Sequence, residues 1–320
     1  MFEINYIIYN NRSTKLVENF LPKVNLLKFL EIERKLNHVN SLFPSLFKIN
    51  FNESDFVSDY KDILYTKEDI SLLKDKILNN SKNISNSVEY KYLIDRGLNI
   101  DIIKKYNIGY ISDNWSKREL DIIGFSEHTL FKNILNQFDQ IGIIIPLFDS
   151  QGVLINICSR KLESGIIKYT LAVPDVHIWG IENMNEGEEC WICEGVFDYI
   201  GLNENGFKNP LSVASASWST IQLYQLLDKK PSLINIFSDY DYTGLRSSLV
   251  LDKFFILNGI RTKTWVSNSC KDASEHFFER KLSVEEVEEI KITTDLLDLI
   301  SIDIENIKKD YISYLKVKTF

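Results

Sequence analysis

The chain has 320 residues, of which 44% are hydrophobic, enough to bury the cores of two or three compact units. Six prolines and 13 glycines argue against a fibrous or largely disordered protein. The formal net charge of −8 gives no whole-chain basic excess of the kind that indicates nucleic-acid binding, although a local basic patch can coexist with an acidic site.

Targeting and redox signals are sparse. No apolar run approaches the roughly 18 residues of a membrane span, and Met1 to Arg12 lack the pattern of a signal peptide. Four scattered cysteines fit a reducing compartment. We therefore expect a cytoplasmic protein without a membrane partner. Its Asn-, Ile- and Lys-rich composition suggests an AT-rich genome, such as that of a phage.

Residues 1–85 predict a mostly helical accessory region. An apolar run lies between Leu26 and Ile32, and Asp69–Leu78 predicts a helix. The segment Asn79–Ser87 is rich in Asn and Ser, which predicts a linker. We place a domain boundary within it, after residue 85.

Residues 86–185 predict an α+β subdomain. Gly97 is a plausible C-cap for its first helix, and the turn residues Asp149 to Gly152 give a hairpin signal. Ser164-Gly165 predicts a second turn. The expected helices and strands are Val88–Arg96, Asn99–Tyr106, Ile141–Phe148, Val153–Ser159 and Ile166–Leu171.

Residues 186–282 alternate strand and helix patterns, which predicts an α/β fold with a parallel sheet and covering helices. The expected strands are Cys190–Cys193, Leu211–Ala214, Leu233–Phe237 and Thr262–Val266. The expected helices are Val196–Asn205, Thr220–Leu227 and Gly244–Asn258. Residues 283–320 predict a tail of two charged helices.

Five carboxylates follow three of these strands. Glu194 directly follows the first strand, and Asp198 comes one helical turn later. Asp239 and Asp241 follow the third strand, and Asp272 lies in the loop after the fourth. Because ligand sites of parallel sheets lie beyond the carboxyl ends of the strands, we expect all five at one rim. Crowded carboxylates repel one another, and Mg²⁺ or Mn²⁺ would relieve that repulsion.

Other patterns carry weaker signals. A single Asp at a strand end is more often an ordinary loop residue than a ligand; the coincidence of five carries the metal hypothesis. Cys190-x-x-Cys193 has the spacing of a zinc half-site, but no second pair exists, so we expect strand residues and no zinc.

The spacing Glu194-Gly195-x-x-Asp198, followed by Asp239-x-Asp241-x-x-Gly244, resembles the TOPRIM signature found in primases, topoisomerases and some nucleases. The resemblance implies metal-dependent phosphoryl chemistry on nucleic acids, with Gly195 and Gly244 as structural residues. It does not specify the reaction.

Residues 88–280 as a whole resemble the RNA-polymerase part of DnaG-type DNA primases. The matching stretches are Tyr92 to Leu98, Ile144 to Asp149, Ser159-Arg160, Lys168-Tyr169, Trp179-Gly180, Cys193 to Asp198, Asp241 to Arg246 and Lys271-Asp272. This resemblance implies an enzyme that joins ribonucleoside triphosphates into RNA primers on single-stranded DNA, with a replicative helicase as partner.

The resemblance also implies roles for individual residues. Glu194, Asp239, Asp241 and Asp272 would hold the ions, with Asp198 in support. Arg96, Arg160 and Lys168 would bind the template strand, and Arg246 would contact phosphates. If Ser164 centres its turn, Arg160 and Lys168 face each other, an unfavourable pair that a phosphate between them would relieve. The alternative is two solvated surface charges.

Departures from the family pattern keep other functions open. No cysteine precedes Cys158, so we expect no zinc-binding module of the DnaG type upstream of it in this sequence. Ser274 stands where the family has a second Asp, and Tyr240 where it often has Gly. The alternatives are a TOPRIM nuclease or other phosphotransferase, and a non-catalytic replication accessory protein that binds DNA or a helicase.

Overall fold

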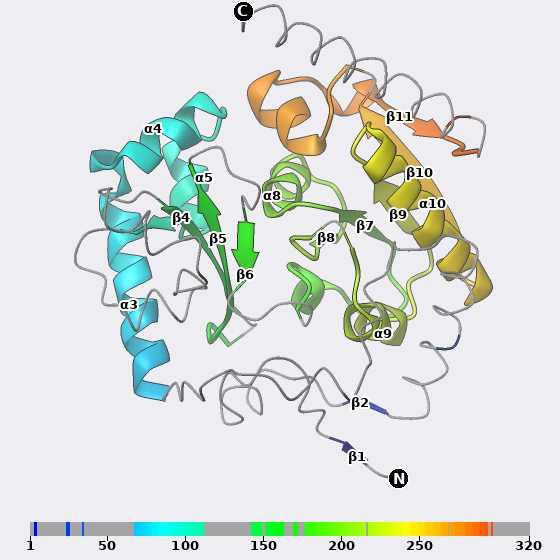
Figure 1. Ribbon diagram of the computed structural model, residues 1–320, viewed down its shortest axis with the longest axis horizontal. Coiled ribbons are helices and arrows are strands. Elements are labelled where there is room, and N and C mark those ends of the chain that lie inside the picture. The colour runs from blue at the N-terminus through cyan, green and yellow to red at the C-terminus, as the bar shows by residue number, and fades with distance from the viewer. Residues whose placement is uncertain are drawn as a thin grey trace, which may run out of the picture. The chain divides into compact units, whose positions relative to one another are not determined.

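The computed structural model describes residues 67–111, 142–148, 151–162, 169–171, 177–215, 217–267 and 269–293, with Glu3–Ile4, Val24–Asn25, Arg34 and Leu296 (Figure 1). These residues form two compact units. The first extends to Met184 and includes α9 (Thr220–Asp228); the second comprises Asn185–Ser217 and the residues from Lys229 onward. The boundary expected at residue 85 falls inside the first unit. None of the helices in these ranges is long and apolar enough to cross a membrane.

Little of the N-terminal region is described. The strands β1 (Glu3–Ile4) and β2 (Val24–Asn25) pair in antiparallel fashion. The apolar run between Leu26 and Ile32 lies outside the described residues.

The linker prediction for Asn79–Ser87 is wrong. The helix α3 (Lys67–Asn83) continues through it and is followed by a 3₁₀ turn, Ile84–Asn86. Polar side chains satisfy backbone groups there: Asn80 Nδ2 donates to the Tyr110 carbonyl at 2.8 Å, and the Ser87 hydroxyl caps the next helix. Ile84 is completely buried. The segment is therefore ordered by caps and by one anchoring apolar residue.

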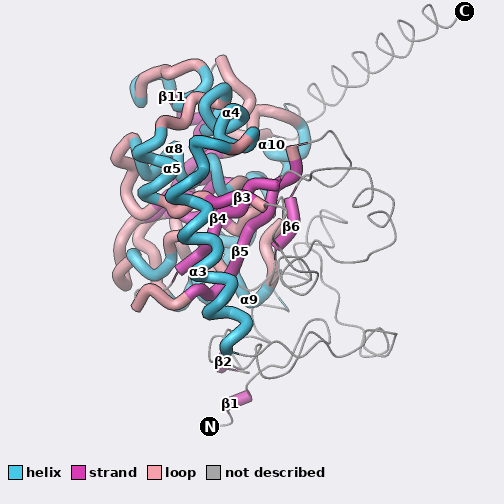
Figure 2. Tube along the Cα trace, turned by 90° about the vertical axis from the view of Figure 1, so that its left-hand side faces the viewer, coloured by secondary structure: helices cyan, strands magenta, loops and turns pink. Residues whose placement is uncertain are grey.

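The first unit contains a four-stranded antiparallel sheet in the order β3-β4-β5-β6, with the predicted hairpin at its centre. The helix α3 runs alongside this sheet in both views (Figures 1 and 2), and Lys74 on it donates to the Gly152 carbonyl at 2.6 Å. The elements are α4 (Val88–Asp95), α5 (Ile100–Lys105), β3 (Gly109–Tyr110), β4 (Gly142–Phe148), β5 (Leu154–Lys161) and β6 (Tyr169–Leu171).

The register between β5 and β6 differs from the expectation by one residue. Arg160 pairs with Tyr169, not with Lys168. The pairing is therefore centred between Ser164 and Gly165 rather than on Ser164. A shift of one residue exchanges the two faces of a strand, so the expected pair of like charges does not form. Lys168 and the turn itself lie outside the described residues.

The second unit contains a five-stranded sheet in the order β11-β10-β9-β7-β8. Its four predicted strands are present and parallel: β7 (Cys190–Cys193), β8 (Pro210–Ser212), β9 (Ile234–Phe237) and β10 (Thr262–Ser267). The helical prediction for the tail is wrong over Val284–Ile290, because Val284–Glu286 is a 3₁₀ turn and β11 (Val287–Ile290) pairs antiparallel with β10. Backbone groups on the outer edge of β10 need partners, and β11 supplies them.

Two helices cover this sheet. From β7 the chain passes through α8 (Val196–Glu204) to β8, and from β9 through α10 (Tyr242–Leu257) to β10. The two connections start from the neighbouring strands β7 and β9 and run towards opposite edges of the sheet. Because such connections between parallel strands are right-handed, the two helices lie on opposite faces (Figure 1). The strand order thus reverses between β7 and β9. Ligands of such sheets bind beside this reversal, at the carboxyl ends of the strands.

A π-helix, Glu275–Glu279, closes the loop after β10 and packs on α8, where Phe277 and Phe278 lie beside Gly201. Its His276 is completely buried: Nε2 donates to the Ser283 carbonyl at 2.9 Å, so Nδ1 accepts from the Ser267 hydroxyl at 2.8 Å. The imidazole therefore fixes both ends of the segment that carries Asp272.

Candidate functional site

The structure brings all five predicted carboxylates together in the second unit. Glu194 follows β7, Asp239 and Asp241 follow β9, and Asp272 follows β10. Electrostatic interactions join Glu194 to Asp198, Asp239, Asp241 and Asp272. This acidic cluster lies at the reversal of strand order.

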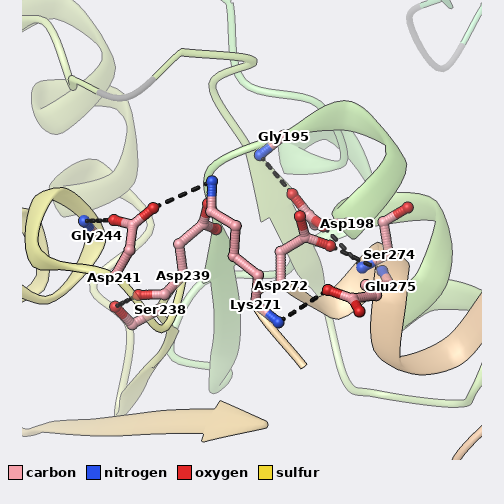
Figure 3. A network of polar contacts seen from close by, with 10 residues as sticks. All are labelled: Gly195, Asp198, Ser238, Asp239, Asp241, Gly244, Lys271, Asp272, Ser274 and Glu275. Atoms are coloured by element: carbon pink, nitrogen blue, oxygen red, sulfur yellow. Dashed lines mark hydrogen bonds and ion pairs between the residues drawn. The ribbon is translucent and has the colours of Figure 1, made fainter. Parts of the chain in front are cut away.

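Asp198 links two parts of the cluster through backbone hydrogen bonds. Its Oδ2 accepts from the Gly195 N–H at 3.0 Å, and its Oδ1 accepts from the Ser274 N–H at 2.8 Å (Figure 3). The side chain is only 8% exposed. A Cβ on Gly195 would lie 2.6 Å from Oδ2, so glycine leaves the room that this contact needs. We interpret Asp198 as a positioning residue that holds α8 against the loop after β10.

Asp241 caps α10, and Asp272 accepts a hydrogen bond from the first residue of the π-helix. Asp241 Oδ1 accepts from the Gly244 N–H at 2.9 Å, and Asp272 Oδ1 accepts from the Glu275 N–H at 2.7 Å. Gly244 is required by close packing, because a Cβ there would lie 2.4 Å from the carbonyl oxygen of Asp239. The first turn of α10 therefore rests directly on the Asp239 backbone. Arg246 follows, half-buried, on the same helix.

Lys271 places a positive charge in the acidic cluster, a feature that the sequence analysis missed. Its Nζ lies 3.1 Å from Asp241 Oδ2 and 3.6 Å from Asp239 Oδ2 (Figure 3). The backbone of Lys271 is held on both sides: its carbonyl accepts from the Tyr240 N–H at 2.6 Å, and its N–H donates to Glu275 Oε2 at 3.0 Å. The available sequence signal was its position immediately before Asp272 in a strand-end loop.

The carboxylates differ in their affinity for protons. Burial, followed by the charges of neighbouring carboxylates, raises the pKa of Glu194 and of Asp239 to about 7 each. Burial also acts to raise the pKa of Asp241, but hydrogen bonds from Gly244 and Lys271 outweigh it and hold that pKa below its ordinary value. Asp241 is therefore the firmly ionised partner of Lys271, whereas at Glu194 and Asp239 burial and neighbouring carboxylates outweigh the charge of the lysine.

The donor chemistry of the acidic cluster fits a hard divalent cation. Carboxylate oxygens are the ligands that Mg²⁺ and Mn²⁺ prefer, and Lys271 shows that a cation is favourable among them. Within the described part of the chain, however, no three Asp, Glu, His or Cys side chains converge closely enough to ligate one ion. The carboxylates thus lie near one another, but two of them, Asp239 and Asp241, contact Lys271.

A second candidate site lies in the first unit. The Arg160 guanidinium makes cation–π contacts with two rings, with its Cζ 5.2 Å from the centroid of Tyr92 and 4.6 Å from that of Tyr169, to whose hydroxyl it also donates. Arg96 Nη1 donates to the Tyr92 hydroxyl at 3.1 Å. Burial, with a contribution from Arg96, lowers the pKa of Arg160. Two of the three predicted template-binding residues therefore share Tyr92, and the third, Lys168, lies outside the described residues.

Comparisons with known proteins point to one group. No protein-family model matches the chain. A DNA primase from Clostridium acetobutylicum is 28% identical over 188 residues, which cover 52% of this chain and 31% of that protein. A DNA primase from Buchnera aphidicola is 24% identical over 257 residues, which cover 72% of this chain and 42% of that protein. The chain thus spans less than half the length of these relatives.

Solved structures share its architecture. A DNA primase domain from Pseudomonas aeruginosa matches with a TM-score of 0.52 at 16% identity, over 69% of this chain and 79% of that one. The RNA polymerase domain of Mycobacterium tuberculosis primase DnaG, in complex with double-stranded DNA, matches with a TM-score of 0.52 at 14% identity, over 66% of this chain and 76% of that one. The chain carries the fold of a DnaG-type primase catalytic core. The resemblance expected from its sequence is therefore confirmed.

Within the DnaG-type pattern, position 274 is the clearest departure. Ser274 is buried, and its backbone N–H donates to Asp198. The position supplies a backbone donor instead of a second carboxylate. The other departure, Tyr240, is half-exposed, and its backbone N–H holds Lys271 in place.

Proposed function

We propose that this chain synthesises short RNA primers on single-stranded DNA, and that the acidic cluster binds the Mg²⁺ or Mn²⁺ ions required for it. One observation carries the proposal: carboxylates from three strand ends gather at the strand-order reversal of a DnaG-type catalytic-core fold. The names of the sequence relatives support the same activity.

Glu194, Asp239, Asp241 and Asp272 would hold the ions. When bound, such ions lower the barrier of nucleotidyl transfer by polarising the attacking hydroxyl and stabilising the departing pyrophosphate. Asp198 would keep the Glu194 loop and the Asp272 loop at a fixed separation through its two backbone contacts. Gly244 would allow α10 to pack on Asp239.

Template binding is assigned to Arg96 and Arg160, together with Lys168. Cation–π contacts with Tyr92 and Tyr169 would restrict the movement of the Arg160 guanidinium, which favours contact with a phosphate group. Arg246 would contact the incoming ribonucleoside triphosphate. A replicative helicase is the proposed protein partner, on the basis of family resemblance.

A metal site built on a TOPRIM sheet also serves cleavage, so the assay must separate synthesis from hydrolysis. Purified protein would be incubated with single-stranded DNA, Mg²⁺ or Mn²⁺ and labelled ribonucleotides, with and without the cognate helicase. Labelled RNA that requires template supports the primase. Shortened DNA indicates a nuclease, and DNA binding with neither product, even with the helicase, indicates an accessory protein.

The same assay tests the metal site. Replacing both Asp239 and Asp241 by Asn should abolish product formation, because the remaining carboxylates no longer offer enough negative charge to hold the ions. The matched control is Glu288→Gln, which removes one exposed carboxylate from β11 in the same sheet and should leave the yield unchanged. Full activity in the double variant would overturn the site assignment.

A further inference from the structure

The side chain of Lys271 is the only part of that residue free to change position, since its backbone is fixed. The Tyr240 N–H and the Glu275 carboxylate hold its carbonyl and its N–H, at 2.6 and 3.0 Å. The side chain itself is 54% exposed, whereas that of Asp239 is 13% exposed. Four flexible methylene groups thus join an anchored backbone to an ammonium group that contacts two carboxylates.

The two contacts of Lys271 involve carboxylates assigned to metal binding. Asp241 Oδ2 and Asp239 Oδ2 both face Nζ, at 3.1 and 3.6 Å (Figure 3). Among the described residues, no three acidic side chains converge on one ion position. A divalent ion and the ammonium group therefore compete for the same oxygens, and electrostatic repulsion between the two cations adds to the competition.

We infer that Lys271 is an internal cation of the metal site, which neutralises Asp239 and Asp241 until a divalent ion displaces its ammonium group. The inference rests on the proposed metal site and adds a regulator of its affinity. The exchange is stoichiometric: one ammonium leaves as the ion arrives, and no covalent bond changes. The released group then points to solvent beside the bound ion, where it can meet an anionic phosphate.

Removing the competitor should strengthen metal binding. Lys271→Met keeps the length of the side chain and removes its charge, so Mn²⁺ should bind about tenfold more tightly, as expected for a lost competing ion pair at a half-exposed site. Lys271→Arg retains the charge and should bind Mn²⁺ about as weakly as the unaltered chain. Free Mn²⁺ would be measured by electron paramagnetic resonance, without nucleotide or DNA.

The matched control is Lys263→Met. Lys263 forms an ion pair with Glu289 at 2.6 Å on the outer part of the same sheet, and its side chain is 43% exposed. This substitution changes the net charge of the protein by the same amount as Lys271→Met. If both variants bind Mn²⁺ equally more tightly, the effect is one of overall charge and the inference fails.

A second measurement needs no substitution. Displacement should expose the Lys271 ammonium, so saturating Mg²⁺ should increase its acetylation rate by a water-soluble reagent, as followed by mass spectrometry, while the rate at Lys263 stays constant. An unchanged or reduced rate at Lys271, in a protein that binds Mg²⁺, overturns the inference and leaves the metal site standing. If neither the unaltered chain nor Lys271→Met binds Mn²⁺, the metal site fails and the inference fails with it.

Discussion

Proton affinity within the acidic cluster is set by which carboxylates have partners. Asp241 accepts from the Gly244 N–H and contacts the Lys271 ammonium at 3.1 Å, whereas at Glu194 and Asp239 burial and the other acids outweigh the charge of Lys271. Their pKa values near 7 lie well above the ordinary 4.5 and 3.8. The folded chain without metal therefore binds protons at these two residues more tightly than the unfolded chain does.

This difference predicts how stability depends on pH. A raised folded-state pKa of an acid contributes stability that is fully present below its unfolded value and is lost as pH rises through the folded value. Without divalent ions, the free energy of unfolding should thus fall between pH 4 and pH 7, the two limits given by these pKa values. We expect a loss of about 1 to 3 kcal/mol after allowing for solvent screening, measured by urea unfolding.

Two comparisons isolate the source of that loss. Asp239→Asn should reduce the pH dependence of the free energy of unfolding between pH 4 and pH 7. Glu288→Gln, at an exposed position, should leave that pH dependence as it is in the unaltered chain. Saturating Mg²⁺ should raise the melting temperature more at pH 8 than at pH 5. Equal stabilisation by Mg²⁺ at both pH values would contradict the pKa assignment.

The sequence was sufficient to locate the acids but not their internal cation. Glu194, Asp239 and Asp241 immediately follow apolar strands, and that local pattern is enough to assign them to one rim. The position of the Lys271 ammonium depends on two loops meeting in space, through the Tyr240 contact. Likewise, the expectation that Arg160 faces Lys168 failed because nothing in the sequence determines the centre of the turn.

At the scale of elements, the strand–helix alternation of the second unit was predictable because each strand is apolar and each helix has clear ends. The errors lie where tertiary contacts override composition. The Asn- and Ser-rich end of α3 is ordered by the buried Ile84 and by a bond to Tyr110. The charged segment of β11 becomes a strand because the edge of β10 is available for pairing. The π-helix that carries His276 has no sequence signal that we recognise.

Replacing Gly244 by Ala should lower both the stability of the fold and its affinity for metal ions. Gly244→Ala should destabilise the fold by about 2 to 4 kcal/mol, because the new Cβ would force the Asp239 backbone to shift. The contact it would create, at 2.4 Å, is with a carbonyl oxygen and not with a flexible side chain. Ala has a higher helix propensity than Gly, which would stabilise the fold by up to about 1 kcal/mol. A net loss of stability would therefore come from the clash between the new Cβ and the Asp239 carbonyl. Urea unfolding and Mn²⁺ titration measure the two effects.

Gly206→Ala is the control for that experiment. Gly206 follows α8 with a φ of +76°, and a Cβ there would have nothing within 4 Å. It should lose about 1 kcal/mol through backbone strain alone and keep its Mn²⁺ affinity. Gly244→Ala with unchanged Mn²⁺ affinity would show that α10 does not position Asp239.

At the scale of the whole molecule, a net charge of −8 makes nucleic-acid binding depend on local basic groups. If Arg160 contacts one phosphate of single-stranded DNA, Arg160→Met should reduce the slope of log affinity against log salt by about 0.7. Tyr169→Leu should weaken binding without a comparable change in slope, because the ring orients Arg160 and carries no charge. Fluorescence anisotropy over a salt series measures both. A slope insensitive to Arg160→Met would leave Arg160 as a packing residue.

Protection against self-association follows from the position of β11. A parallel sheet that ended at β10 would present a row of unpaired backbone groups, to which a strand of another copy could add. β11 occupies that edge and brings the exposed Glu288, whose charge repels an identical neighbour. Proteolytic loss of this short strand would therefore expose the edge of β10 as a template for aggregation, with no change at the acidic cluster.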